Sequence, residues 1–187
     1  MFVEYLSNLF KTVPFAIYHG LALVFVIGTI IFLILYGYKK GFRCSLGILL
    51  LEYVFLLLCS TVLFRTYREP PGINLLPLWS YREAIIEGSH KILFEIIMNI
   101  VVFIPIGFLL GCLCKDIRWW KVILISGFIS FTIECLQYIY ERGFDETDDL
   151  INNILGASVG FCFYSIGKKL FEGISKSASV EKKDVLK

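Results

Sequence analysis

The chain has 187 residues, 57% of them hydrophobic, and its mean hydropathy of +0.75 excludes an ordinary soluble domain. The formal net charge is only +2, so charge alone selects no class of partner. A short basic C-terminal stretch suits anionic lipid as well as nucleic acid. We therefore expect no nucleic-acid partner.

Apolar segments long enough to cross a bilayer recur five times along the chain. The hydrocarbon core is about 30 Å thick and requires roughly 20 apolar residues per helix. Because the bilayer offers no water to the backbone, each segment must satisfy its own hydrogen bonds and is predicted to be helical. The sequence thus predicts an all-α, polytopic membrane helix bundle of about five transmembrane helices, at residues 15–36, 46–64, 93–114, 122–140 and 150–171.

The basic residues give this bundle an orientation, because Lys and Arg accumulate in short cytoplasmic loops. Twelve of them follow the first, third and fifth segments, whereas six lie on the opposite side. We expect the N-terminus outside and the C-terminus in the cytoplasm. Residues 1–172 would form one transmembrane domain in the cell membrane, and residues 173–187 a solvated, mobile and basic cytoplasmic tail.

The outer loop between the second and third segments is rich in arginine and aromatic residues. Arg65, Arg68 and Arg82 carry planar guanidinium groups that match phosphate or carboxylate. These arginines could therefore contact the phosphate of a lipid headgroup. Trp79 and Tyr81 suit a membrane interface, and simple anchoring there explains both aromatic residues.

The third segment carries Glu95 and Asn99 on one helical face near its outer end. Asn99 could hydrogen-bond across to Asn153 or Gln137, either as a packing contact or as part of a ligand site. Further along, Pro105 leaves one carbonyl without its usual donor and is expected to kink the helix. Helix packing is the expected role of Pro105 and of Gly107.

The fourth segment carries Glu134 and Gln137, which lie three residues apart on one face near the outer surface. An ionisable group in a membrane helix usually faces a bundle interior or an aqueous cavity, so Glu134 is a candidate functional residue. The competing interpretation is an interfacial glutamate that pairs with Arg142.

The stretch "ERGFDETDDLINN", residues 141–153, joins the fourth helix to the fifth. Asp148 and Asp149 stand where the fifth helix is expected to begin, and capping of that helix would explain either one alone. Asn153 lies four residues beyond Asp149 on the same face. Small residues that allow close approach of another helix continue this stripe, at Gly156 and Gly160.

These polar residues are predicted to converge on one outward-facing site. Its members come from three helices and one loop: Asn99, Glu134, Gln137, Arg142, Asp145, Asp149 and Asn153. Hard cations prefer oxygen ligands, so Asp145, Asp148 and Asp149 could hold a divalent cation. An ordinary solvated acidic loop explains the same three carboxylates without a metal.

Three stretches taken together resemble the VanZ-like membrane family. They are "NLLPLWSY" at residues 74–81, the N-x5-P-x-G pattern from Asn99 to Gly107, and E-x2-Q-x4-R-x-F-D-x3-D-L-I-N-N-I-L-G from Glu134 to Gly156. They lie within residues 74–160, nearly half of the chain. The family's polar pattern falls on Asn99, Glu134, Gln137, Arg142, Asp145, Asp149, Asn153 and Gly156, and spacing favours Asn153 over Asn152.

The resemblance implies a multi-pass bacterial cell-membrane protein, and the role of the family's namesake implies resistance to the glycopeptide antibiotic teicoplanin. One function is then a non-catalytic resistance or envelope protein, whose outer site binds a membrane lipid or a lipid-linked cell-wall precursor. The glycopeptide would be affected indirectly, through reduced accumulation at the cell surface.

An integral-membrane enzyme is the alternative, acting on lipid-linked phosphate or glycan at the outer leaflet. Glu134 would serve as its general acid or base, although no nucleophile stands out in the sequence. A small transporter is the third interpretation. It is less favoured, because the sequence shows five helices, no internal repeat and little polarity in the inner half.

Overall fold

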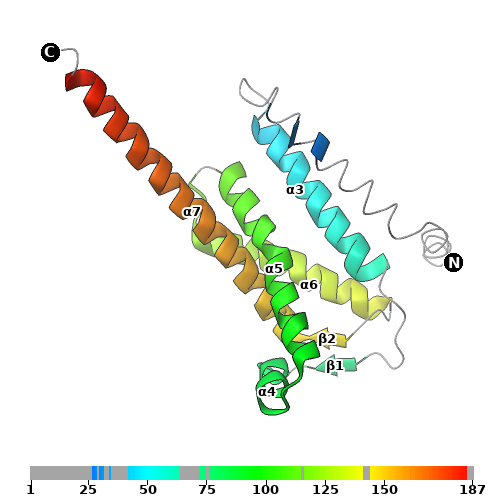
Figure 1. Ribbon diagram of the computed structural model, residues 1–187. Helices are drawn as coiled ribbons and strands as arrows, with labels where there is room; N and C mark the ends of the chain where they lie inside the picture. Colours follow the sequence, from blue (N-terminus) through cyan, green and yellow to red (C-terminus); the bar gives the residue numbers. More distant parts are fainter. Residues whose placement is uncertain are drawn as a thin grey trace.

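The computed structural model describes residues 42–63, 72–74, 76–114, 116–140 and 144–184, with the isolated helical residues 27, 28, 30, 31 and 34. Figure 1 shows the arrangement of its elements. In chain order these are α3 (Phe42–Leu58), the π-helical turn η1 (Cys59–Leu63), β1 (Gly72–Asn74), α4 (Trp79–Ile86), α5 (His90–Leu113), α6 (Trp119–Ile139), β2 (Phe144–Glu146) and α7 (Thr147–Asp184).

Four helical segments of the described chain are long and apolar enough to cross a membrane. They are Arg43–Val62, His90–Leu113, Trp119–Ile139 and Thr147–Ser175. These segments confirm the second to fifth predicted helices, with ends that differ by only a few residues. The first predicted helix, at 15–36, lies outside the described residues except for its five isolated helical positions. The chain is thus a polytopic, helical membrane protein.

The last helix is longer than the sequence predicts. α7 stays helical to Asp184, beyond the expected domain boundary at residue 172. Figure 1 shows its C-terminal part projecting away from the other helices. The membrane-spanning part of α7 ends near Ser175.

The closest helix pair is α5 with α7, and it is closest at glycines. A side-chain carbon on Gly107 would overlap the backbone of Ala157, and one on Gly156 would overlap the carbonyl of Ile100. Only residues without a Cβ allow two helices to touch backbone to backbone in this way. Gly160 meets Ile104 in the same manner one turn further along. The contact fixes how the polar N-terminal parts of α5 and α7 face each other.

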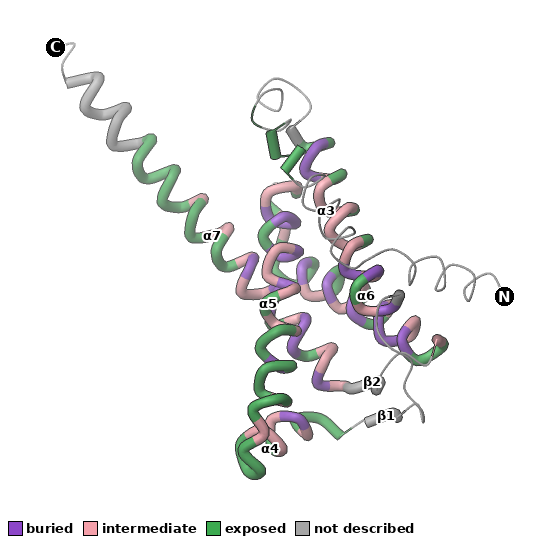
Figure 2. The backbone as a smooth tube through the Cα atoms, turned by 45° about the vertical axis from the view of Figure 1, so that its right-hand side comes forward, coloured by how far each residue is buried: buried purple, intermediate pink, exposed green. Residues whose placement is uncertain are grey.

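The bundle core lies where α5, α6 and α7 meet, as the buried segments in Figure 2 show. Phe103 and Ile106 of α5 pack there with Val122 of α6 and Ala157 of α7. Large apolar residues on the outer faces, such as Leu51 and Phe128, are exposed. Exposed apolar side chains on spanning helices are expected to face lipid, because lipid tails are as apolar as they are.

α5 continues as a helix through Pro105. Proline cannot donate to the carbonyl four residues before it, here that of Val101. The next carbonyl, of Val102, accepts a hydrogen bond of 2.7 Å from the Tyr53 hydroxyl. Tyr53 thereby joins α3 to α5 beside the proline.

The structure contains two short strands that were not predicted from the sequence. β1 and β2 pair in parallel, with Ile73 opposite Asp145. The pairing places the segment before α4 beside the segment before α7 (Figure 1). It therefore brings the starts of α4 and α7 to the same end of the bundle.

Candidate functional site

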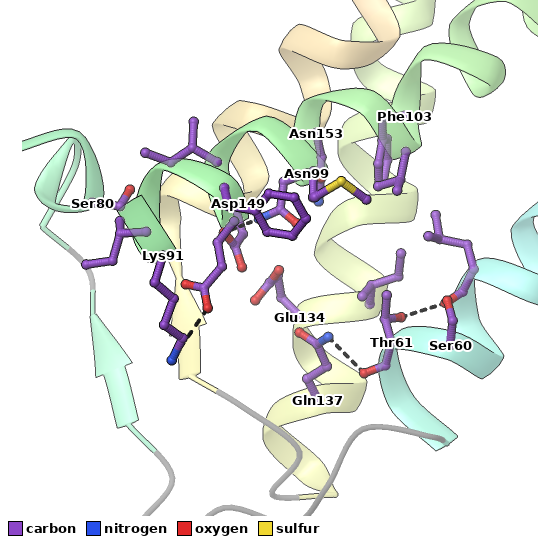
Figure 3. Close-up of a pocket in the computed structure, with 18 of the residues that line it drawn as sticks. Ser60, Thr61, Ser80, Lys91, Asn99, Phe103, Glu134, Gln137, Asp149 and Asn153 are labelled. Atoms are coloured by element: carbon purple, nitrogen blue, oxygen red, sulfur yellow. Dashed lines mark hydrogen bonds and ion pairs between the residues drawn. The ribbon is translucent and has the colours of Figure 1, made fainter. Parts of the chain in front are cut away.

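A cavity of about 470 Å³ lies at the end of the bundle where α5 and α7 begin and where α3 and α6 end. Figure 3 shows the side chains that surround it. Its polar lining comes from η1 and from α4, α5, α6 and α7: Ser60, Thr61, Ser80, Lys91, Glu95, Asn99, Glu134, Gln137, Asp149 and Asn153.

Five of the seven residues predicted for the polar site line this cavity: Asn99, Glu134, Gln137, Asp149 and Asn153. Of the other two, Arg142 lies outside the described residues, and Asp145 belongs to β2 with a side chain that is not described. The structure therefore gathers the predicted members from α5, α6 and α7 around one space.

The three arginines predicted to contact phosphate do not form part of the described lining. Arg82 is exposed on α4 and does not line the cavity. Arg65 and Arg68 lie outside the described residues. Lys91 is the basic residue that the described part of the chain contributes to the lining. It forms an exposed ion pair of 3.8 Å with Glu95, one turn along α5.

α6 contributes two deeply buried polar side chains to the lining. Glu134 is 5% exposed and Gln137 is 3% exposed. The Gln137 amide nitrogen donates to the carbonyl of Thr61, at 3.1 Å. Thr61 lies in η1, and the last carbonyls of a helix lack helical donors. Because a carbonyl can only accept, this bond orients the amide and leaves the Gln137 oxygen on the side of Glu134 (Figure 3).

Asn99 joins α5 to the first turn of α7. Its amide nitrogen donates to the Asp149 carboxylate at 2.5 Å, so the expected partners, Asn153 and Gln137, are not those that the structure gives. Two physical reasons favour Asp149. A carboxylate is a stronger acceptor than an amide, and the close contact of Ile100 with Gly156 sets Asn99 beside the preceding turns of α7.

The adjacent residues Asn152 and Asn153 point to different surroundings. Asn153 lines the cavity, and its amide nitrogen donates to the Ser130 hydroxyl at 2.8 Å. Asn152 is fully buried away from the cavity, where its oxygen accepts the hydroxyl proton of Tyr81. Burial, followed by the negative charge of Asp148, raises the pKa of Tyr81 and keeps its phenol protonated as a donor.

Asp148 holds the start of α4. Its two carboxylate oxygens accept the backbone N–H groups of Leu78 (2.5 Å) and Ser80 (2.8 Å), and also the Ser80 hydroxyl (2.5 Å). Leu78 precedes α4 in the left-handed conformation, with φ of 64°, and has no capping side chain of its own. Asp148 therefore caps a neighbouring helix, across 70 residues of sequence.

The predicted divalent cation finds no set of ligands in the described part of the chain. No three His, Cys, Asp or Glu side chains described there stand close enough to hold a metal ion. Asp148 already accepts three hydrogen bonds. The side chain of Asp145 is not described, so a cation at Asp145, Asp148 and Asp149 stays a prediction.

Sequence reasoning missed three residues that support the site: Thr61, Ser80 and Ser130. Each binds a predicted site residue or its neighbour through a long-range hydrogen bond. One signal existed for Ser80: the segment "LPLWS" begins a helix without Ser, Thr, Asp or Asn at the N-cap. Such a helix must have its first N–H groups satisfied from elsewhere.

One wall of the cavity faces the surroundings of the bundle. Phe94 and Met98 line the cavity, yet they remain 63% and 39% exposed on the membrane-spanning α5. The same space therefore borders both buried polar groups and apolar side chains at the bundle surface. The cavity suits an amphiphilic molecule. Its polar headgroup can contact the buried polar groups, while its apolar chain contacts the apolar side chains at the bundle surface.

Comparisons with known proteins agree with the resemblance of the motifs. The family model described as VanZ/LLP1 matches residues 44–168. Protein VanZ of Enterococcus faecium is 28% identical over 103 residues, which cover 51% of this chain and 62% of that protein. The chain thus spans less than two thirds of the length of this relative. No solved structure matches the chain.

Proposed function

Because the chain belongs to the VanZ/LLP1 family, we propose that it contributes to teicoplanin resistance by binding a lipid-linked envelope component at the outer leaflet of the cell membrane. The proposal joins the resemblance to the family's namesake with the location and lining of the cavity. The distribution of Lys and Arg supports an outward-facing cavity.

The observation that supports this proposal most directly is that the cavity has one polar wall and one apolar wall. Buried polar groups at Glu134 and Gln137 line its inner wall, and the exposed Phe94 and Met98 line its outer wall. The acyl or prenyl chain of a lipid would remain in the bilayer against the outer wall. Its headgroup would enter toward α6 and α7. Holding such lipids would change the surface on which a glycopeptide accumulates.

Binding without turnover agrees better with the cavity hydroxyls than catalysis does. Ser60 and Thr61 both donate to the carbonyl of Leu57, and Ser80 donates to Asp148. A backbone carbonyl cannot take the proton of a nucleophile, and the Asp148 carboxylate that meets Ser80 is already held by the backbone N–H groups of Leu78 and Ser80.

Antibiotic susceptibility tests this proposal. A sensitive Gram-positive host would express the wild-type chain, an empty vector, Glu134→Gln or Glu172→Gln, with membrane levels matched by quantitative immunoblot. Glu172 is exposed on the far part of α7 and serves as the matched control. We expect the wild type and Glu172→Gln to raise the inhibitory teicoplanin concentration, and Glu134→Gln to lose that protection.

Two outcomes would reject the proposal in different ways. Wild type that gives no more protection than the empty vector would reject teicoplanin resistance for this chain. Full protection by Glu134→Gln would reject the cavity as the site responsible.

A further inference from the structure

Two buried oxygens at the cavity have no hydrogen-bond partner within the described part of the chain. They are Gln137 Oε1 and Asn153 Oδ1, on side chains that are only 3% and 5% exposed. Both residues line the cavity. A buried acceptor that forms no hydrogen bond costs free energy, and nearly all such groups in folded proteins have a partner. A bound molecule can supply the partners.

The amide nitrogens of both side chains are already engaged. Gln137 Nε2 binds the Thr61 carbonyl, and Asn153 Nδ2 binds the Ser130 hydroxyl. These contacts leave the two oxygens for the cavity, so the groups still to be satisfied on these two side chains are acceptors and not donors. The occupant must therefore bring N–H or O–H groups.

From this pattern we infer that the cavity takes a hydroxyl-rich glycosyl headgroup, with sugar hydroxyls donating to Gln137 and Asn153. The inference rests on the proposed function, since it names the chemical class of the headgroup at the same site. An ionised phosphodiester offers acceptors only, so it cannot satisfy these oxygens. Arg82 of α4 does not line the cavity, and Lys91, which does, is paired with Glu95.

The distribution of the acceptors favours a sugar over an ammonium group. Gln137 belongs to α6 and Asn153 to α7, so the two oxygens come from different helices. Hydroxyls spread around a sugar ring can serve both helices at once, whereas an ammonium group concentrates its donors at one point. Trp79 also lines the cavity, and its flat indole offers an apolar surface to one face of a ring. The volume of about 470 Å³ is typical of sites for small molecules.

Native mass spectrometry of the purified full-length protein in detergent tests the inference. The probes are three lipids with identical acyl chains, namely diglucosyldiacylglycerol, phosphatidylethanolamine and phosphatidylmethanol, whose phosphodiester carries no donor, together with free maltose. We expect the diglucosyl lipid to bind at least tenfold more tightly than the other two lipids. Competition by maltose would show that the sugar alone is recognised. Absence of competition beside a clear preference for the diglucosyl lipid would show that the acyl chains contribute.

Adjacent asparagines provide a matched pair of variants. Asn153→Ala removes a cavity acceptor and should weaken binding of the diglucosyl lipid about tenfold, as expected for one lost hydrogen bond in a buried site. Asn152→Ala removes an equally buried amide outside the cavity and should change binding less than twofold. Asn153→Asp keeps an acceptor oxygen, and the Ser130 hydroxyl can donate to it, so it should bind more tightly than Asn153→Ala.

Equal binding of the three lipids would overturn the inference, as would equal losses from Asn152→Ala and Asn153→Ala. A preference for phosphatidylethanolamine would overturn it in favour of an ammonium ligand. These failures differ from failure of the proposed function. Protection lost in Glu134→Gln without any preference for the diglucosyl lipid would leave the resistance role standing, and a preference without protection would leave the glycosyl site standing.

Discussion

At the scale of single residues, two neighbouring aspartates have different tasks. Asp148 is 1% exposed and accepts three hydrogen bonds from the start of α4. Asp149 lines the cavity and accepts the Asn99 amide. Asp148 thus holds α4 against the bundle, while Asp149 belongs to the site itself.

Asp148→Asn should destabilise the protein more than Asp149→Asn does. Asparagine at 148 offers one oxygen in place of two and turns an NH₂ group toward the N–H groups of α4. Hydrogen bonds to a charged group are each worth roughly 1.5–3 kcal/mol, and a loss of about 2 kcal/mol lowers Tm by about 4–8 °C in a chain of this size. Asparagine at 149 can still accept from Asn99. Thermal unfolding of the purified variants in detergent measures the difference, and equal Tm values would contradict this role of Asp148.

The sequence predicted five of the polar residues that line the cavity, but not what each one binds. Helical spacing put Asp149 and Asn153 on one face, and both line the cavity. Spacing also kept Asn152 apart, and Asn152 faces α4. The task of Asp148 depends on where α4 lies, and that position is set by contacts across 70 residues of sequence. A local sequence pattern cannot predict a contact between residues so far apart in the chain.

At the scale of elements, the α5–α7 pair is the frame of the site. Its backbone contacts at Gly107, Gly156 and Gly160 hold Asn99 beside Asp149. Any displacement of α7 along α5 would separate these two groups. The small residues therefore act on the cavity although they do not line it.

Gly156→Ala should weaken both the fold and the site, whereas Gly167→Ala should not. A Cβ at 156 overlaps the Ile100 carbonyl, but one at 167 meets no atom within 4 Å. Overpacking of this kind costs about 1–3 kcal/mol, while alanine in place of an uncrowded helical glycine gains about 0.5–1 kcal/mol. Tm in detergent should fall for Gly156→Ala and stay level or rise for Gly167→Ala. A stable Gly156→Ala protein would show that the helices do not pack at this glycine.

The four described spans were predictable, because length and hydropathy alone identify a membrane helix. The β1–β2 pair was not, since three-residue strands such as Gly72–Asn74 carry no readable alternation. The extension of α7 was missed for another reason. Residues 173–184 are polar, and polarity ends a membrane span without ending a helix.

At the scale of the whole molecule, a group of basic residues and the cavity lie at opposite ends of the bundle. The cavity lies where α5 and α7 begin. At the other end, Lys168 of α7 donates to Asp116, between α5 and α6, at 2.8 Å. Arg43, Arg118 and Lys121 also stand at helix starts that belong to this basic end. The positive-inside bias therefore predicts an outward-facing cavity.

Labelling of single cysteines in intact cells tests this orientation. One variant keeps only the native Cys114, which is exposed at the end of α5, and the other carries only Glu87→Cys, at an exposed position between α4 and α5. A maleimide that cannot cross the membrane should label Glu87→Cys in intact cells and Cys114 only after the cells are opened. The reverse pattern would place the cavity in the cytoplasmic half. A lipid headgroup in the outer leaflet could then not reach Glu134 and Asp149, so the outer-leaflet binding proposed for teicoplanin resistance would fail with it.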